Sequence, residues 1–168
     1  MEDTERIYLP GFGHQWLLPL YDIAAKWLGV EAAHRQLLDQ ANIQPGHRVL
    51  EIGCGTGNLA SLVKRHHPKA DIIGLDPDPK ALARTRRKAE RKALSVRLDH
   101  GFSDVLPYPD GSFDRVLSAM MFHHLLSLDE KIGTLREVRR VLRPGGSLHL
   151  LDFEGGTGPS GGHLTRLL

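Results

Sequence analysis

Three glycines at alternate positions, Gly53, Gly55 and Gly57, lie between a short apolar stretch and a segment with helical character. Glycine removes side chains where a chain turns sharply and lets the backbone come close to a ligand. In an open α/β sheet, ligands lie outside the carboxyl ends of the strands, and the loop after the first strand is found there. Residues 49–60 therefore form a candidate ligand-binding loop.

Two classes of nucleotide-containing cofactor are compatible with such a loop. Dinucleotide binders use G-x-G-x-x-G, in which the helix N-terminus receives a pyrophosphate. Here the spacing is G-x-G-x-G, and Asn58 takes the place of the third dinucleotide glycine. Glu51, two positions before the first glycine, would repel a pyrophosphate but favour a cationic ammonium or sulfonium group. The glycine spacing alone does not decide between the two classes.

A second acidic residue, Asp76, ends the next apolar stretch about 20 residues after the loop, where an acid can accept hydrogen bonds from both hydroxyls of a ribose. The structural alternative is that Asp76 caps the following helix. Asp78 competes for that cap because it directly precedes Pro79. Ribose binding is therefore the favoured interpretation of Asp76.

The elements that must position these residues alternate along the chain. Strands are predicted over residues 48–52, 71–75, 95–98, 113–119 and 147–153. Helices are predicted over residues 14–28, 31–41, 58–65, 79–93 and 129–142. Strands that alternate with helices of this kind predict an α/β fold with a parallel sheet covered by helices on both faces.

The same pattern predicts three parts of the chain. Residues 1–45 form an N-terminal helical segment and possible lid, residues 46–154 form the ligand-binding domain, and residues 155–168 form a glycine-rich tail. Tyr21 lies in the first part and could help to enclose an apolar substrate. The single cysteine, Cys54, lies inside the glycine loop, and we expect it to be a small packing residue.

Composition limits the class of protein. The 168 residues are 40% hydrophobic and 25% charged, which is typical of one ordinary globular domain. A formal net charge of +2 gives no argument for a nucleic-acid partner. No stretch approaches the roughly 20 apolar residues of a membrane span, and the first residues lack the order of a signal peptide. We therefore expect a cytoplasmic protein with no nucleic-acid partner and no membrane span.

Four segments in sequence order resemble class I S-adenosylmethionine-dependent methyltransferases. Residues 49–60 resemble their motif I, and residues 74–76 resemble the acidic end of their second strand. Residues 101–114 (GFSDVLPYPDGSFD) and 135–146 (LREVRRVLRPGG) are similar to the small-molecule branch that includes the ubiquinone and menaquinone C-methyltransferases. The resemblance implies a Rossmann-like sheet with the strand order 3-2-1-4-5.

This resemblance also implies the cofactor S-adenosyl-L-methionine and the product S-adenosyl-L-homocysteine. The residues that it places at the methionine half of the cofactor are Glu51, Gly53, Gly55 and Thr56. It places Asp76 at the ribose, Pro77 beside the adenine and Ala119 near the methyl end. No third ligand at a familiar spacing accompanies the histidines of the chain, so we expect no metal site.

The adenine end departs from the family pattern. An Asp followed by a small residue is usual there, but these two places fall on Phe102 and Ser103. Phe102 cannot accept a hydrogen bond from the adenine amino group, although it could pack against the ring. Asp104 could supply the missing acceptor if the loop shifts.

The acceptor end is less well specified. The resemblance places Met120, His123 and His124 near the cofactor's methyl group and the substrate. Either histidine is a candidate general base, and at most one is expected to face the substrate because neighbouring side chains point in different directions. Positioning supplies much of the catalysis of methyl transfer, and a base is needed only if the nucleophile is protonated.

Related enzymes usually have two more strands after the fifth. Residues 155–168 offer no strand pair, so we expect strands 6 and 7 to be lacking and the leucine-rich strand over 147–153 to be an exposed edge. A homodimer or another protein would cover it; a shortened form of a longer enzyme is the alternative.

The resulting prediction is a methyltransferase that acts on a small, possibly apolar metabolite. A non-catalytic S-adenosylmethionine-binding subunit of a larger assembly is the alternative, favoured by Phe102 and by the short carboxyl-terminal region. A NAD-dependent oxidoreductase is disfavoured by Asn58.

Overall fold

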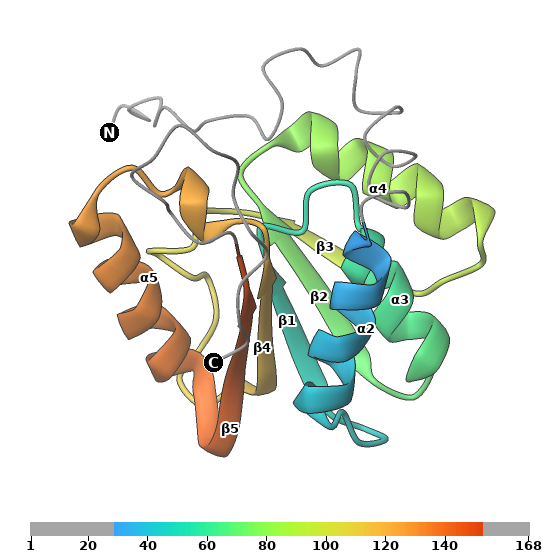
Figure 1. The fold of residues 1–168 in the computed structure, drawn as a ribbon, viewed down its shortest axis with the longest axis horizontal. Coiled ribbons are helices and arrows are strands. Elements are labelled where there is room, and N and C mark those ends of the chain that lie inside the picture. The colour runs from blue at the N-terminus through green and yellow to red at the C-terminus, as the bar shows by residue number, and fades with distance from the viewer. Residues whose placement is uncertain (1–28, 153–168) are drawn as a thin grey trace.

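The computed structural model of this chain describes residues 29–152, which form a five-stranded sheet flanked by helices (Figure 1). The strands are β1 (Arg48–Ile52), β2 (Asp71–Asp76), β3 (Arg97–His100), β4 (Phe113–Ala119) and β5 (Leu142–Leu151). Neighbouring strands are parallel throughout, and their spatial order is β3-β2-β1-β4-β5. The predicted fold class, parallel sheet and strand order are therefore confirmed.

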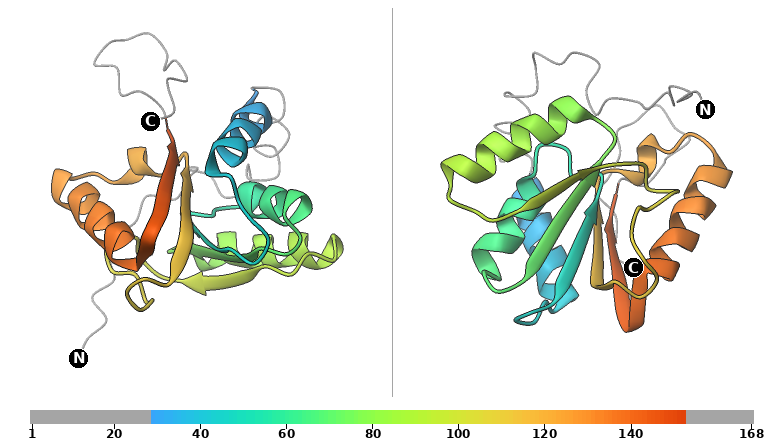
Figure 2. Two further views of the ribbon diagram at one scale, coloured as in Figure 1. Left: turned by 90° about the horizontal axis from the view of Figure 1, so that it is seen from below. Right: turned by 180° about the vertical axis from the view of Figure 1, so that it is seen from behind.

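Helices cover both faces of the sheet, as predicted. On one side lie α2 (Val30–Ala41), α3 (Asn58–His66) and α4 (Pro79–Arg91), and on the other lies α5 (Leu128–Val141) (Figure 2, left). A short 3-10 helix, η2 (Phe122–His124), connects β4 to α5. Ser127 and Glu130 form a capping box at the start of α5, which satisfies backbone N–H groups that the helix itself cannot pair.

Residues 29–152 contain two apolar core clusters, because successive side chains of a strand point to opposite faces. On β1, Val49 belongs to the cluster beneath α2 and α3, whereas Leu50 and Ile52 belong to the cluster on the α5 side. Leu37 and Leu38 of α2 are buried in the first cluster. Residues 30–41 therefore belong to the core that supports the glycine loop.

The connection from β3 to β4 packs side chains into the second cluster without forming a helix. Leu106 and Tyr108 of this loop are buried there. The Arg140 guanidinium on α5 donates to the carbonyl oxygens of Tyr108 and Leu106 at 2.8 and 3.0 Å. The Leu106 backbone N–H in turn donates to Glu137 at 2.8 Å. These bonds attach residues 101–112 to α5.

Two predicted strand boundaries were wrong in part. β3 spans Arg97–His100 instead of residues 95–98, because its pairing with β2 continues through the polar residues Asp99 and His100. β5 begins at Leu142, directly after α5, and passes an irregularity in its pairing with β4 before the ladder becomes regular at Ser147. An apolar pattern does not reveal either feature.

Parts of the prediction lie outside the described residues. These are the helix over 14–28, the candidate lid with Tyr21, and the tail over 155–168. Within residues 29–152, no helix combines the length and the apolar composition that crossing a membrane requires.

Candidate cofactor and acceptor site

The loop after β1 adopts a backbone conformation that favours glycine at three positions. Gly53, Gly55 and Gly57 have φ angles of 70°, 48° and 69°. A Cβ on Gly53 would lie 2.2 Å from Cγ of Met121, and one on Gly57 would lie 2.3 Å from Cγ2 of Thr85. A Cβ on Gly55 would meet no described atom within 4 Å. Gly53 and Gly57 thus permit close packing, whereas Gly55 leaves space for a ligand to approach the backbone.

Two contacts hold Gly55 in place. Its backbone N–H donates to Oδ2 of Asp76 at 2.7 Å, and its carbonyl oxygen accepts from the Thr85 hydroxyl at 2.7 Å. Thr85 is buried on the face by which α4 packs, together with Ala81 and Ala89. Thr85 was not among the predicted site residues, although its spacing of four residues from each of these alanines places it on that face.

Asp76 ends β2 with both carboxylate oxygens engaged. Its Oδ1 accepts from the Asp78 backbone N–H at 2.9 Å, while Asp78 caps α4 by accepting from the Lys80 N–H at 2.8 Å. Burial raises the pKa of Asp76, and the N–H donors of Asp78 and Gly55 oppose that rise. The cap is therefore Asp78, which leaves Asp76 at the loop. Each of its oxygens retains capacity for a second hydrogen bond, such as one from a ribose hydroxyl.

Glu51 is a buried acid between the sheet and α3. The Ala60 backbone N–H, in the first turn of α3, donates to its carboxyl group, and burial raises the pKa of Glu51 well above its usual value. Its Oε2 has no hydrogen-bond partner among the described residues. A buried polar atom of this kind is costly unless something pairs with it. A cationic ligand at the loop would both supply a donor and favour the ionised carboxylate.

Cys54 is a packing residue, as predicted. It is buried, and a Cβ on Gly74 would lie 2.9 Å from its Sγ. Burial raises the pKa of the Cys54 thiol well above its usual value, with the nearby acids Glu51 and Asp76 adding to the rise. The group is therefore a neutral thiol that fills the space beside β2.

His100, at the end of β3, was not among the predicted site residues. His100 pairs with Asp76 in the sheet register, and its Nε2 lies 3.0 Å from the carbonyl oxygen of Pro77. Ser103 is 2.8 Å from the Thr134 hydroxyl of α5, oxygen to oxygen. Phe102, half-buried, precedes Ser103 at the start of the same loop. Asp99 and His100 end β3, and two polar residues at the end of a strand do not by themselves indicate a ligand site.

The segment after β4 lies against the glycine loop. Met120 has a φ of 57°, unusual for a residue other than glycine, and its N–H donates to the Leu151 carbonyl at 2.7 Å. Met121 follows, with its side chain against Gly53. Ala119, at the end of β4, packs against the first core cluster. Backbone conformations of this kind are found often at functional sites.

The adjacent histidines differ in their partners. Nδ1 of His123 lies 2.6 Å from Oδ1 of Asp152, and the His123 backbone N–H donates to Oδ2 of the same carboxylate at 3.1 Å. Burial lowers the pKa of His124, and the neighbouring His123 adds to that effect. Asp152 was not among the predicted site residues. A signal for it exists, because it follows the last strand as Asp76 ends the second.

The structure brings the predicted residues Glu51, Gly55 and Asp76 together at the carboxyl ends of β1 and β2. The segment that carries His123 lies at the same edge of the sheet, after β4. Ligands of open α/β sheets lie at this edge. Fold and site therefore define a Rossmann-like protein that binds a nucleotide-containing cofactor.

Comparison with known proteins identifies the family. The model of the methyltransferase domain matches residues 49–146. A demethylmenaquinone methyltransferase of Thermus thermophilus is 37% identical over 140 residues, which cover 82% of this chain and 62% of that protein. The chain thus spans less than two thirds of the length of this relative. It belongs to the class I S-adenosylmethionine-dependent methyltransferases, and S-adenosylmethionine is the cofactor of that family.

Solved structures share this fold. The YcgJ protein of Bacillus subtilis matches with a TM-score of 0.67 and 30% identity, over 73% of this chain and 51% of that one. The [4+2]-cyclase SpnF matches with the same TM-score and identity, over 73% of this chain and 44% of that one. A protein described as a cyclase therefore shares this fold at the same level of similarity, so the reaction must be argued from the site itself.

Proposed function

We propose that this chain transfers a methyl group from S-adenosylmethionine to a small, apolar acceptor of the quinone type, and that it does so in the cytoplasm. The observation that carries the proposal is the contact between Asp76 and the Gly55 backbone N–H. It joins a ribose-binding acid to the one loop glycine with open space beside it. The acceptor class is suggested by the relative named demethylmenaquinone methyltransferase.

The residues present fit this cofactor. Oε2 of Glu51 is a buried acceptor that lacks a partner among residues 29–152, and a cationic amino-acid group is a suitable donor for it. Gly53, Gly55 and Thr56 would hold the methionine half of the cofactor beside Glu51. The cofactor supplies an electrophilic methyl group on a sulfonium, which needs positioning more than activation.

The other predicted contacts concern the ribose, the adenine and the methyl group. Asp76 would bind the ribose, and Pro77 and Phe102 would flank the adenine. Ser103 already contacts Thr134, so its hydroxyl contributes to holding the loop as well as to any ligand contact. Ala119 would lie near the methyl group.

On the acceptor side, Met120 and His123 would contact the substrate. The contact of Tyr21 with an acceptor stays a prediction, because that residue lies outside the described part of the chain. His124 is the weaker candidate for a base, since the structure pairs Asp152 with the ring of His123.

Calorimetry followed by an activity screen tests the proposed function. We expect binding of S-adenosylmethionine and S-adenosylhomocysteine and no binding of NAD. With naphthols and hydroquinones as acceptors, the protein should then release S-adenosylhomocysteine. Binding of NAD in place of S-adenosylmethionine would contradict the proposal and favour an oxidoreductase.

A non-catalytic cofactor-binding subunit is the second candidate function. One observation favours it: Phe102 stands where the family usually has an adenine-end acid. Cofactor binding without release of S-adenosylhomocysteine from any acceptor, alone or with candidate partners, would establish this alternative.

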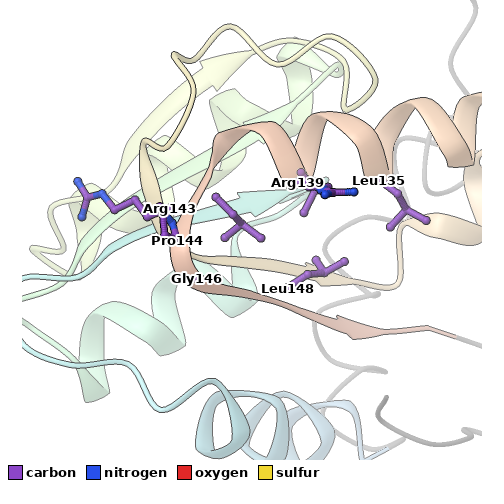
Figure 3. Close-up of a pocket in the computed structure, with 8 residues that line it drawn as sticks. Leu135, Arg139, Arg143, Pro144, Gly146 and Leu148 are labelled. Carbon is purple, nitrogen blue, oxygen red and sulfur yellow. The ribbon is translucent and has the colours of Figure 1, made fainter.

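We also propose that a second copy of the chain covers β5. Among the described residues β5 pairs only with β4, so its other edge presents unpaired backbone groups. A groove beside this edge, between α5 and β5, is lined by apolar Leu135, Val138, Leu142 and Leu148 together with Arg139 and Arg143 (Figure 3). An apolar surface of this kind is a common site of association.

Sedimentation velocity tests the dimer. We expect Leu135→Asp, which places a charge in the groove, to give a monomer, whereas Leu126→Asp, at an exposed leucine before α5, should leave the dimer intact. A wild-type monomer with full activity would contradict the proposal.

A further inference from the structure

Asp152 and His123 form a close pair at the rim of the site. One carboxylate oxygen contacts Nδ1 of the ring at 2.6 Å, and the other accepts the backbone N–H of the same residue at 3.1 Å. The Asp152 side chain is 12% exposed, and that of His123 is 36% exposed. Short hydrogen bonds to an ionised group are the stronger kind, and two of them from one carboxylate restrict both the ring and its backbone.

The pair lies where an acceptor would meet the cofactor. Asp152 directly follows β5, and η2 with His123 directly follows the end of β4. The Met120 N–H to Leu151 carbonyl bond joins these two strand ends. Met121, between Met120 and η2, packs its side chain on Gly53 of the cofactor loop. The imidazole is thus two residues away from a side chain that contacts the loop.

We propose that Asp152 is a positioning residue that holds His123 in the Nδ1–H tautomer, so that Nε2 takes a proton from a hydroxyl group of the acceptor. This inference rests on the proposed function and narrows its acceptor to hydroxylated aromatic or enolic compounds. A carboxylate that accepts from one ring nitrogen sets the tautomer and makes the other nitrogen the proton acceptor.

The proton step balances without a further reactant. The acceptor's O–H bond breaks, its proton moves to Nε2 of His123, and the electron pair remains on oxygen. That pair, directly or through a conjugated ring carbon, forms the bond to the methyl carbon as the carbon–sulfur bond breaks and its electrons stay on sulfur. When a ring carbon is methylated, that carbon then loses its own hydrogen to solvent as a proton and the oxygen regains a proton, which restores the aromatic ring. Asp152 stabilises the imidazolium, as a carboxylate does beside other catalytic histidines.

A purely structural role for Asp152 makes different predictions. Its bond to the His123 backbone N–H helps to hold η2 whether or not the ring takes part in chemistry. If the role is structural, substitution of Asp152 would lower the stability of the fold and would lower the rate of methylation equally for all acceptors. A role in positioning a base would change the tautomer of the His123 ring. It would also slow the methylation of each acceptor by an amount that depends on how readily that acceptor loses a proton.

Nitrogen-15 NMR of the histidine rings tests the pairing without any acceptor. We expect the Nδ1–H tautomer for His123 in the neutral wild-type ring and its loss in Asp152→Asn. The control is Asp129→Asn, the same chemical change at an exposed site on α5, which should leave the His123 signals unchanged. An Nε2–H tautomer in the wild-type protein would overturn the proposal.

Kinetics with two probe acceptors test the chemical role. For naphthol, which is neutral at the assay pH, we expect His123→Asn and Asp152→Asn each to lower kcat by about 100-fold, the size of a general-base effect. For nitronaphthol, which is largely ionised, the loss should be several-fold at most, and the dissociation constant of S-adenosylmethionine should not change. The matched control for the histidine is His66→Asn, at an exposed site on α3.

The outcomes are separable. Equal losses for the two probes, or a larger loss from His124→Asn than from His123→Asn, would overturn the proposal. Cofactor binding by a wild-type protein that methylates neither probe would contradict the proposed function instead. The tautomer measurement would still decide whether Asp152 holds the ring of His123.

Discussion

Asp76 and Asp152 occupy similar places, at the carboxyl ends of β2 and β5, but they hold different groups. Asp76 accepts from the backbone N–H groups of Gly55 and Asp78, which belong to a loop and to the start of a helix. Asp152 accepts from the backbone N–H of His123 and contacts the ring of the same residue. The first arrangement shapes a backbone surface, and the second orients a side chain.

This difference matches the two tasks of the site. A cofactor that is the same in every turnover can be bound by fixed backbone geometry, which is achieved by buried residues such as Asp76 and Thr85. His123, which is proposed to meet the acceptor, lies nearer the surface, with its side chain 36% exposed. The two halves should therefore respond differently to substitution.

The largest effect is expected within the cofactor half, at Gly57. In Gly57→Ala the new Cβ would meet the buried Thr85 side chain at 2.3 Å in a left-handed backbone, so we expect a loss of unfolding free energy of about 3 kcal/mol. Gly55→Ala meets no described atom within 4 Å and should cost about 1 kcal/mol, the strain alone. Urea denaturation measures both, and equal losses would contradict the separate roles of these glycines.

The second-largest effect is expected for Asp76→Asn. The substitution replaces an ionised acceptor by an amide that cannot accept at both positions, so we expect cofactor affinity to fall on the order of 100-fold. Isothermal titration calorimetry with S-adenosylmethionine measures the change. Asp78→Asn is the matched control, because asparagine caps a helix about as well as aspartate and the affinity should hold.

Glu51→Gln separates stability from binding. Because burial raises the pKa of Glu51 in the folded protein, the folded state binds more protons than the unfolded chain between the two pKa values. The unfolding free energy therefore falls as the pH rises from the usual glutamate range toward the raised pKa.

The glutamine variant should lose that part of the pH dependence and be no less stable than the wild type at pH 7. Its affinity for S-adenosylmethionine should fall about tenfold, the effect of losing a charged hydrogen-bond partner. Thermal denaturation across pH and calorimetry measure the two effects. A large loss of stability in Glu51→Gln at pH 7 would show that Glu51 is mainly a support for α3.

Ser103→Ala should have the smallest effect. It removes the contact with Thr134 that connects the loop after β3 to α5, so we expect a loss of unfolding free energy of about 1 kcal/mol. Cofactor affinity should change by less than about threefold, because Ser103 holds the loop after β3 in place and does not itself need to contact the cofactor. A tenfold loss of affinity with unchanged stability would instead assign the Ser103 hydroxyl to the adenine.

Sequence reasoning recovered the parts whose geometry is local. The β1 boundaries, the loop glycines and the Asp78 cap follow from residues close together in the chain, and Asp76 follows from strand alternation. The pairing of His123 with Asp152 spans 29 residues, and no spacing rule predicts it. The contact of Thr85 with Gly55 spans 30 residues and depends on how α4 packs. Such contacts are set by tertiary packing.

The dissociation constant of S-adenosylmethionine, measured for the wild type, Asp76→Asn and His123→Asn, tests the separation of the two halves most directly. We predict that Asp76→Asn loses most of its affinity, whereas His123→Asn binds the cofactor as the wild type does. Equal loss of affinity in the two variants, or no binding by the wild type, would contradict the separation of the cofactor half from the acceptor half.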